Sequence, residues 1–271
     1  MIANARMYDV SESAGQAWHA LFAHAATRAI VDWSWIDHAA PAPVSALWAR
    51  PDCGCVFMCG LPYISSPVRK RLLAAPVPAL PRYGDRPVYY TEFIARADAP
   101  FDVLEQSFGT RLACMLEESN SGYNAPRHHL LRLAPADAQA LYRPTAAPTP
   151  TPREVIDAVL GGAAEVGVVD SYVLDLLRRH EPRLISGLRT LAVTQASPIP
   201  PLVASPQIDA AVAARIGAAL QGLHLDPVAA PLLEQLQVAR FAPVAEAGYA
   251  VLAERRREAD TRGFALTAAT P

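Results

Sequence analysis

Short apolar segments of strand composition alternate along the chain with longer segments of helical periodicity, and this alternation constrains the fold most strongly. Residues 4–8 are predicted to form a strand, and in residues 12–30 the apolar side chains recur at the spacing of one helical face. Residues 165–169 predict a buried strand, which leads into a helix over residues 172–179. Repeated strand–helix units are typical of α/β domains, in which helices cover a sheet.

Two proline-rich segments, 76–87 and 144–152, are predicted to interrupt this pattern. After the second one, Thr151-Pro152-Arg153-Glu154 has the sequence of a capping box and should start a helix that ends at Gly161. Further strands are expected at residues 53–59, 88–96, 110–116, 188–194 and 202–204, and further helices at residues 44–48, 101–108, 121–131, 207–220, 228–237 and 244–259.

Composition and charge exclude several classes of protein. Of the 271 residues, 52% are hydrophobic and only 18% are charged, which is too apolar for a disordered chain. The formal net charge of −2 and the lack of a dense basic block disfavour binding to nucleic acid or to an anionic membrane. No apolar run reaches the roughly 18 residues that span a bilayer, and the first residues, as written, contain no signal-peptide pattern.

A serine-rich turn, Ser119-Asn120-Ser121-Gly122, lies between a predicted strand and a predicted helix. A hydroxyl cap at a helix start, together with the free amides of the first turn, makes an anion-binding site. An ordinary N-cap, however, requires the same residues. Thr151 presents a second helix start, which in a sheet of this kind would lie at the carboxyl ends of the strands, where ligands usually bind.

Asp170 follows the predicted strand 165–169 and is a second kind of candidate. Its carboxylate could accept a hydrogen bond from a ligand, or it could cap the helix that follows it. Local sequence does not decide between these two interpretations.

Five segments, in this order and spacing, resemble the phosphonate, phosphite and phosphate substrate-binding proteins of ABC transporters, which have the type II periplasmic-binding-protein fold. They are Met7-Tyr8-Asp9, Cys59-Gly60-Leu61-Pro62-Tyr63, Tyr89-Tyr90-Thr91, Glu118-Ser119-Asn120-Ser121-Gly122-Tyr123, and Gly162 to Ser171. The resemblance implies an α/β protein of two lobes, each with a mixed sheet flanked by helices. It also implies a ligand cleft between the lobes that closes by hinge motion. We expect residues 1–86 in the first lobe, 87–195 in the second, and 196–271 as a mainly helical return to the first.

The resemblance further implies the function: non-catalytic capture of a small oxyanion-bearing ligand for ABC transport, without a cofactor. The serine-rich turn would bind the anion, with hydroxyl, carboxylate and aromatic side chains completing the site. The expected ligand-binding residues are Ser119, Asn120, Ser121, Gly122, Thr151, Asp170, Tyr8, Tyr63 and Thr91. One departure affects specificity, because the family often has a Ser-His pair where this chain has Thr151-Pro152.

The family is periplasmic and its members work with a transporter permease, so these become the expected location and partner. The missing signal pattern leaves the cytoplasm as the alternative location. An enzyme or a ligand-sensing domain on the same fold remains open as an alternative function, although no catalytic motif is present.

A thiol–metal protein is the lesser alternative. Cys53, Cys55 and Cys59 fall on one face of a predicted strand, and His38 is near them in sequence. The adjacent His128 and His129 would point about 100° apart on a helix, which disfavours joint chelation.

Overall fold

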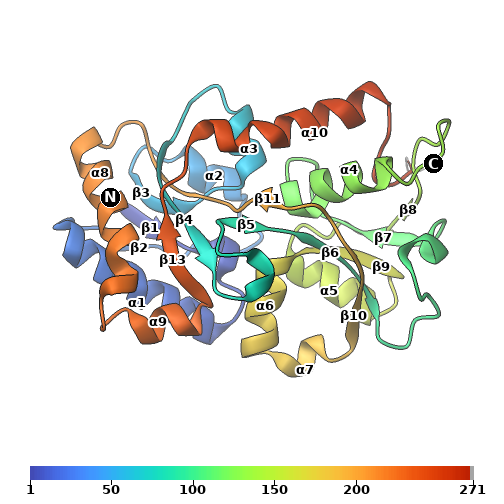
Figure 1. Ribbon diagram of the computed structural model, residues 1–271, viewed down its shortest axis with the longest axis horizontal. Helices are drawn as coiled ribbons and strands as arrows, with labels where there is room; N and C mark the ends of the chain where they lie inside the picture. The colour runs from blue at the N-terminus through green and yellow to red at the C-terminus, as the bar shows by residue number, and fades with distance from the viewer. Residues whose placement is uncertain (269–271) are drawn as a thin grey trace. The chain divides into compact units, whose positions relative to one another are not determined.

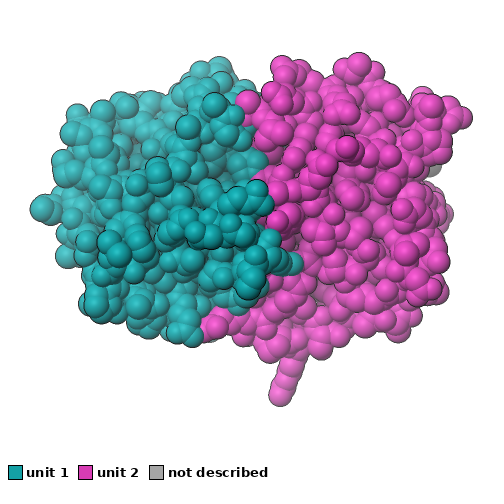
Figure 2. Space-filling view, viewed as in Figure 1, with its two compact units in different colours: residues 1–88, 198–249 teal, residues 89–197, 250–271 magenta. Residues whose placement is uncertain are grey.

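The structure is a computed structural model in which residues 1–268 are described, and the chain folds into two compact units. The first unit comprises Met1–Val88 and Pro198–Tyr249, coloured teal in Figure 2. The second comprises Tyr89–Ser197 and, among the described residues, Ala250–Ala268, coloured magenta. Both are α/β, which confirms the predicted fold class.

The first unit contains a mixed six-stranded sheet in the order β13-β4-β12-β3-β1-β2. β1 pairs in parallel with β2 and β3, whereas β12 and β13 run antiparallel to their neighbours. The strands are β1 (Ile2–Asn4), β2 (Ser34–Trp35), β3 (Cys53–Phe57), β4 (Arg71–Pro78), β12 (Leu202–Ala204) and β13 (Val238–Ala242).

Helix α1 (Glu12–Ala29) supplies much of the core of the first unit. Its Trp18 ring lies 5.1 Å from the ring of Phe57 on β3 and 5.7 Å from that of Phe22, all three being buried. Such edge-to-face aromatic contacts add to the free energy of burial. The other helical elements are α2 (Val44–Ala49), α3 (Gly60–Ser65), α8 (Ala210–Gly222), α9 (Ala230–Gln235) and the short 3₁₀ turns η1 (Arg6–Tyr8), η2 (Pro81–Tyr83), η5 (Leu223–Leu225) and η6 (Glu246–Tyr249).

The second unit contains a five-stranded sheet in the order β10-β6-β9-β7-β8 (Figure 1). Its strands are β6 (Thr91–Arg96), β7 (Arg111–Ala113), β8 (Arg143–Pro144), β9 (Val166–Asp170) and β10 (Leu188–Val193). Its helical elements are η3 (Leu104–Ser107), the π-helical turn η4 (Asn120–Asn124), α4 (Ala125–Leu131), α5 (Pro152–Leu160), α6 (Ser171–His180), α7 (Pro182–Ile185) and α10 (Ala250–Thr261). Two further strands, β5 (Val88–Tyr89) and β11 (Ser197–Pro198), form a small sheet where the chain passes between the units.

The largest difference from the predicted strands is β4, which runs into the first proline-rich segment. Prolines cannot donate to a sheet ladder, so a central strand with two of them was not expected. The structure accommodates them because β12 pairs only with residues 71–74 of β4. Pro76 and Pro78 pair only with β13. On the other edge of β4 no strand among the described residues lies beside these prolines, so no backbone hydrogen bond is required from them on that edge.

Other predictions of secondary structure were also wrong in part. The helix expected at residues 101–108 is only the 3₁₀ turn η3 (Leu104–Ser107). The strand expected at residues 4–8 is β1, which ends at Asn4, and Arg6–Tyr8 form a 3₁₀ turn. The helix expected at 228–237 is the shorter α9, and the chain then forms strand β13, which the sequence analysis missed.

The return segment also divides differently from the expected lobe boundaries, because α10 groups with the second unit. Hydrogen bonds from Asn124 and from Arg127 on α4 hold α10 in the second unit. Asn124 Nδ2 donates to the carbonyl of Leu252 (3.1 Å), and Arg127 Nη1 donates to Asp260 Oδ1 (2.6 Å). Residues 198–249 group with the first unit.

Candidate functional site

Predicted ligand-binding residues of the second unit gather at one edge of its sheet. β7 and β9 are parallel, so their carboxyl ends, and with them Asp170, lie at the same edge. β6 runs antiparallel to β9 and begins there, with Thr91 opposite Asp170 in the ladder. The serine-rich turn that follows β7 is joined to this edge by a hydrogen bond of 2.9 Å from Thr91 Oγ1 to the carbonyl of Ser121.

The serine-rich turn is a single π-helical turn that leads into α4. Ser119 caps it, because its Oγ accepts a hydrogen bond from the Gly122 amide (3.1 Å). A Cβ at Gly122 would lie 2.5 Å from that of Met115, so only glycine fits without a shift of the turn. π-helical turns are rare and are found frequently at functional sites.

Ser121 differs from its neighbours in this turn. Its hydroxyl makes no hydrogen bond with any residue of the described chain, and the residue is half-buried. Its amide belongs to the first helical turn, which has no intrahelical acceptors. Ser121 therefore offers two unengaged donors side by side, which is what a tetrahedral oxyanion requires.

The side chain of Asn120 anchors the turn to the interior of the protein. It is fully buried, and its Nδ2 donates to the Tyr89 hydroxyl at 2.9 Å. Asn124 Nδ2 donates in turn to Asn120 Oδ1 at 3.0 Å. The spacing of four residues between the two asparagines is a helical signal for this pair. Neither Asn124 nor Tyr89 is among the expected ligand-binding residues.

The N-terminus of α5 lies at the same edge of the sheet. Thr149 Oγ1 donates to the carbonyl of Cys114, just past the end of β7, and the far end of α5 reaches the start of that strand through Arg111 and Gly162. The predicted capping box is confirmed. Thr151 Oγ1 accepts from the Glu154 amide (3.2 Å) and lies 2.6 Å from Glu154 Oε2, so its hydroxyl is already engaged with a carboxylate.

Asp170 caps α6, as one of its two interpretations required. Its Oδ1 accepts hydrogen bonds from the amides of Tyr172 (2.7 Å) and Val173 (3.2 Å), and the residue is buried. A ligand-binding role for Asp170 stays a prediction.

Tyr8 and Tyr63 belong to the first unit, and both are buried. The Tyr8 ring stands edge-on to Phe57 at 4.9 Å between centroids, and the Tyr63 ring lies 5.4 Å from that of Tyr249. Burial, together with the charge of Glu246, raises the pKa of the Tyr63 hydroxyl, which therefore stays protonated at neutral pH. Their contact with a ligand stays a prediction.

The thiol–metal alternative is not supported. Within residues 1–268, no group of three histidine, cysteine, aspartate or glutamate side chains is placed to hold a metal ion. The Cys53 thiol donates to the carbonyl of Leu47, and burial raises its pKa to about 11. Burial also raises the pKa of Cys55, so both thiols remain protonated and are poor metal ligands.

Comparison with known families identifies the protein's class. The family described as "ABC transporter, phosphonate, periplasmic substrate-binding protein" matches residues 55–249, which is most of the chain. The chain belongs to this family. It is therefore a substrate-binding protein of the phosphonate ABC-transporter type rather than an enzyme, as the sequence analysis expected.

Solved structures of low sequence identity share the fold. A binding protein component of an ABC phosphonate transporter from Pseudomonas aeruginosa superposes with a TM-score of 0.77 at 14% identity, covering 97% of this chain and 88% of that one. PhnD1 from Prochlorococcus marinus, in complex with methylphosphonate, gives a TM-score of 0.75 at 14% identity, covering 96% and 98%. XAC2383 from Xanthomonas citri, bound to ATP, gives 0.65 at 18% identity, covering 96% and 97%. No match was found among curated proteins.

Family membership also implies a small-molecule ligand and a permease as partners, and the family is periplasmic. No helix in the described part of the chain is both long enough and apolar enough to cross a membrane.

Proposed function

We propose that the protein captures a small phosphorus oxyanion of the phosphonate, phosphite or phosphate class and delivers it to an ABC-transporter permease in the periplasm. The serine-rich turn receives the anion. Ser121 Oγ and the Ser121 amide donate to its oxygens, and the positive end of the helical segment η4–α4 faces its charge. Tyr8 and Tyr63 of the first unit contribute contacts to the rest of the ligand.

The unengaged hydroxyl of Ser121 is the observation that carries the proposal. The other hydroxyls predicted to bind the anion have partners: Thr91 donates to Ser121, Ser119 caps the turn, and Thr151 is engaged with Glu154. Ser121 alone among these four presents a hydroxyl that no described residue uses. Thr91 fixes the carbonyl of Ser121, so the donors of this residue are held in place before ligand arrives.

The experiment is calorimetric titration of the full chain with methylphosphonate, phosphite, phosphate, sulfate and ATP. ATP is included because a relative of this fold has been solved with it, and a terminal phosphate could occupy the same turn. We expect saturable binding of at least one phosphorus oxyanion and a matching rise in melting temperature, since ligand at about 100 times Kd stabilises a protein by about 2.7 kcal/mol. Absence of binding by every phosphorus compound would overturn the proposal.

A further inference from the structure

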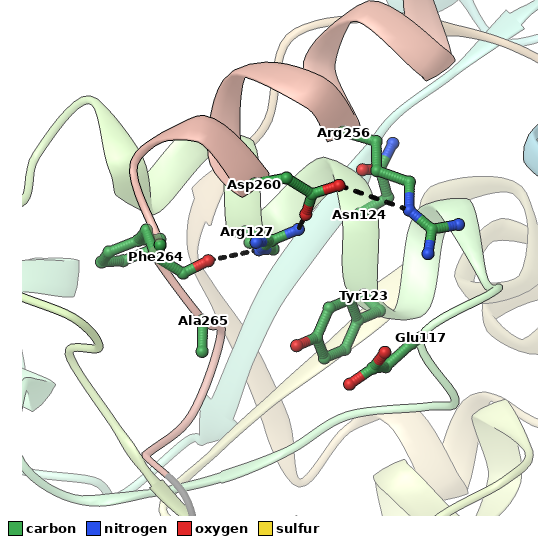
Figure 3. Close-up of a pocket in the computed structure, with 9 residues that line it drawn as sticks. Glu117, Tyr123, Asn124, Arg127, Arg256, Asp260, Phe264 and Ala265 are labelled. Carbon is green, nitrogen blue, oxygen red and sulfur yellow. Dashed lines mark hydrogen bonds and ion pairs between the residues drawn. The ribbon is translucent and has the colours of Figure 1, made fainter.

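The second unit contains a pocket of about 300 Å³ that none of the predicted ligand-binding residues lines (Figure 3). Its polar wall comes from Glu117, Tyr123, Asn124, Arg127, Arg256 and Asp260, and the chain after α10, residues 263–265, closes it. A volume of this size is at the lower end of the range of small-molecule sites. Both signs of charge line it in equal number, two arginines and two carboxylates.

Two of these charges are committed to each other. Arg127 is largely buried and donates to Asp260 Oδ1 (2.6 Å) and to the carbonyl of Phe264 (2.5 Å). These two hydrogen bonds connect α4 to the end of α10 and to the chain after it, and so fix one side of the pocket. Arg127 is therefore a structural part of the pocket wall, with its Nε and Nη1 engaged within the unit.

Arg256 is the cation with spare capacity. Its Nε lies 3.8 Å from Asp260 Oδ2, beyond hydrogen-bond distance, and the guanidinium makes no other ion pair or hydrogen bond with described residues. Because Asp260 is held by Arg127, it compensates the Arg256 charge only in part. Arg256 can offer a two-pronged donor to a carboxylate, the geometry that guanidinium groups favour.

Glu117 is the anion with spare capacity. Its carboxylate has no hydrogen bond or ion pair with the described residues, and in Figure 3 it lies beside the Tyr123 ring. Burial and the negative charge of Glu117 raise the pKa of the Tyr123 hydroxyl, so that hydroxyl remains a donor at neutral pH. The uncommitted charges of the pocket are thus one cation and one anion on different segments.

Asn124 adds an acceptor that lacks a donor. The residue is 2% exposed, its Nδ2 donates to two oxygens, and its Oδ1 has no hydrogen-bond partner. The two bonds of Nδ2 fix the orientation of the amide, so a flip would not cure the deficit. An unpaired buried carbonyl is costly, which points to a donor that the chain itself does not provide.

We propose that this pocket binds a small zwitterion with a carboxylate and an ammonium group close together, the chemistry of a free α-amino acid. The carboxylate pairs with Arg256, and the ammonium group pairs with Glu117. The pocket shares Tyr123 and Asn124 with the turn η4, but it contains neither Ser121 nor any other residue proposed to contact the anion.

The test is an NMR titration of the isotope-labelled full chain with glycine, glutamine, glutamate and lysine, and separately with acetate and methylammonium, which each carry one of the two groups. We expect saturable amide shifts at Tyr123, Arg256 and Gly263 with at least one amino acid, and weaker binding of the single-group probes. Arg256→Met and Glu117→Gln should each weaken binding about tenfold or more, as expected for a lost charge-assisted bond. Arg257→Met and Glu118→Gln, exposed neighbours outside the pocket, should leave it unchanged.

Methylphosphonate is titrated into the same samples, so a failure of this proposal is distinguishable from a failure of the proposed transport function. The pocket proposal is overturned if no amino acid gives saturable shifts up to about 50 mM, far above a millimolar Kd. It is also overturned if the shifts centre on Ser119–Gly122, or if Arg256→Met and Arg257→Met bind equally well.

Discussion

The two hydroxyl-capped helix starts of the second unit lie at the same edge of its sheet, yet they differ in the hydrogen-bond donors that they offer a ligand. At Thr151 the capping box is closed, and the hydroxyl and the Glu154 carboxylate satisfy each other. At Ser119–Gly122 the capping is done by Ser119, which leaves the Ser121 hydroxyl without a hydrogen bond to any described residue. The closed capping box at Thr151 stabilises α5, but it uses the hydroxyl that an anion would need. The serine-rich turn keeps the Ser121 hydroxyl available and is therefore the better anion-binding site.

The largest expected effect is that of Ser121→Asp. A carboxylate in place of the hydroxyl would face the bound oxyanion, and such like-charge contacts cost several kcal/mol. We expect the affinity for the phosphorus oxyanion to fall at least about 100-fold by calorimetry, with the far-UV circular dichroism unchanged. The same substitution at the exposed Ser186 is the control. Equal affinity of Ser121→Asp and wild type would contradict the assignment of the anion site to the serine-rich turn.

Asn120→Ala should affect both binding and stability. The substitution removes the donor to the buried Tyr89 hydroxyl and the acceptor of Asn124 Nδ2, which should destabilise the protein by about 1–3 kcal/mol. The turn then loses its support, so affinity should also fall, though less than with Ser121→Asp. Denaturant unfolding and calorimetry measure the two effects, and a loss of stability with unchanged affinity would show that Asn120 does not position the turn.

Ser121→Ala and Thr151→Ala should have opposite effects: the first should lower affinity and spare stability, and the second should lower stability and spare affinity. Ser121 Oγ makes no hydrogen bond in the described chain, so its removal should leave the melting temperature unchanged and cost about 1.5 kcal/mol or more of binding, a hydrogen bond to a charged group. Loss of the Thr151 cap should cost about 1 kcal/mol of stability and little affinity. The reverse pattern would mean that the anion binds at the closed cap.

Glu154→Gln has the smallest expected effect. It removes a negative charge from the start of α5 at the edge where the anion is proposed to bind, so affinity should rise, by about threefold or less. Calorimetry in low-salt buffer measures it, and Asp157→Asn on the same helix is the control. A fall in affinity would show that Glu154 assists binding instead of opposing it.

The sequence predicted much of this arrangement where a signal was local. The capping box at Thr151 and strand β9 could be recognised because their residues are adjacent in the chain. Strand β4 could not, because whether its prolines are tolerated depends on which neighbour it pairs with. The position of α10 in the second unit rests on contacts such as Arg127 with Asp260, more than a hundred residues apart, which no local pattern encodes.

The same limit applies to the candidate site. Sequence identified Ser119, Ser121 and Thr151 as equivalent hydroxyls, since each can start a helix. Only the hydrogen bonds separate the engaged Thr151 from the unengaged Ser121. Asp170 carried two interpretations, and its bonds to Tyr172 and Val173 establish the capping one.

A crystal structure of the full chain with methylphosphonate tests the central claim most directly. We predict phosphonate oxygens at hydrogen-bond distance, about 2.7–3.1 Å, from Ser121 Oγ and from the Ser121 amide, with the Thr151–Glu154 capping box intact. Phosphonate bound at the start of α5, with the capping box opened and Ser121 without contact to the ligand, would contradict it.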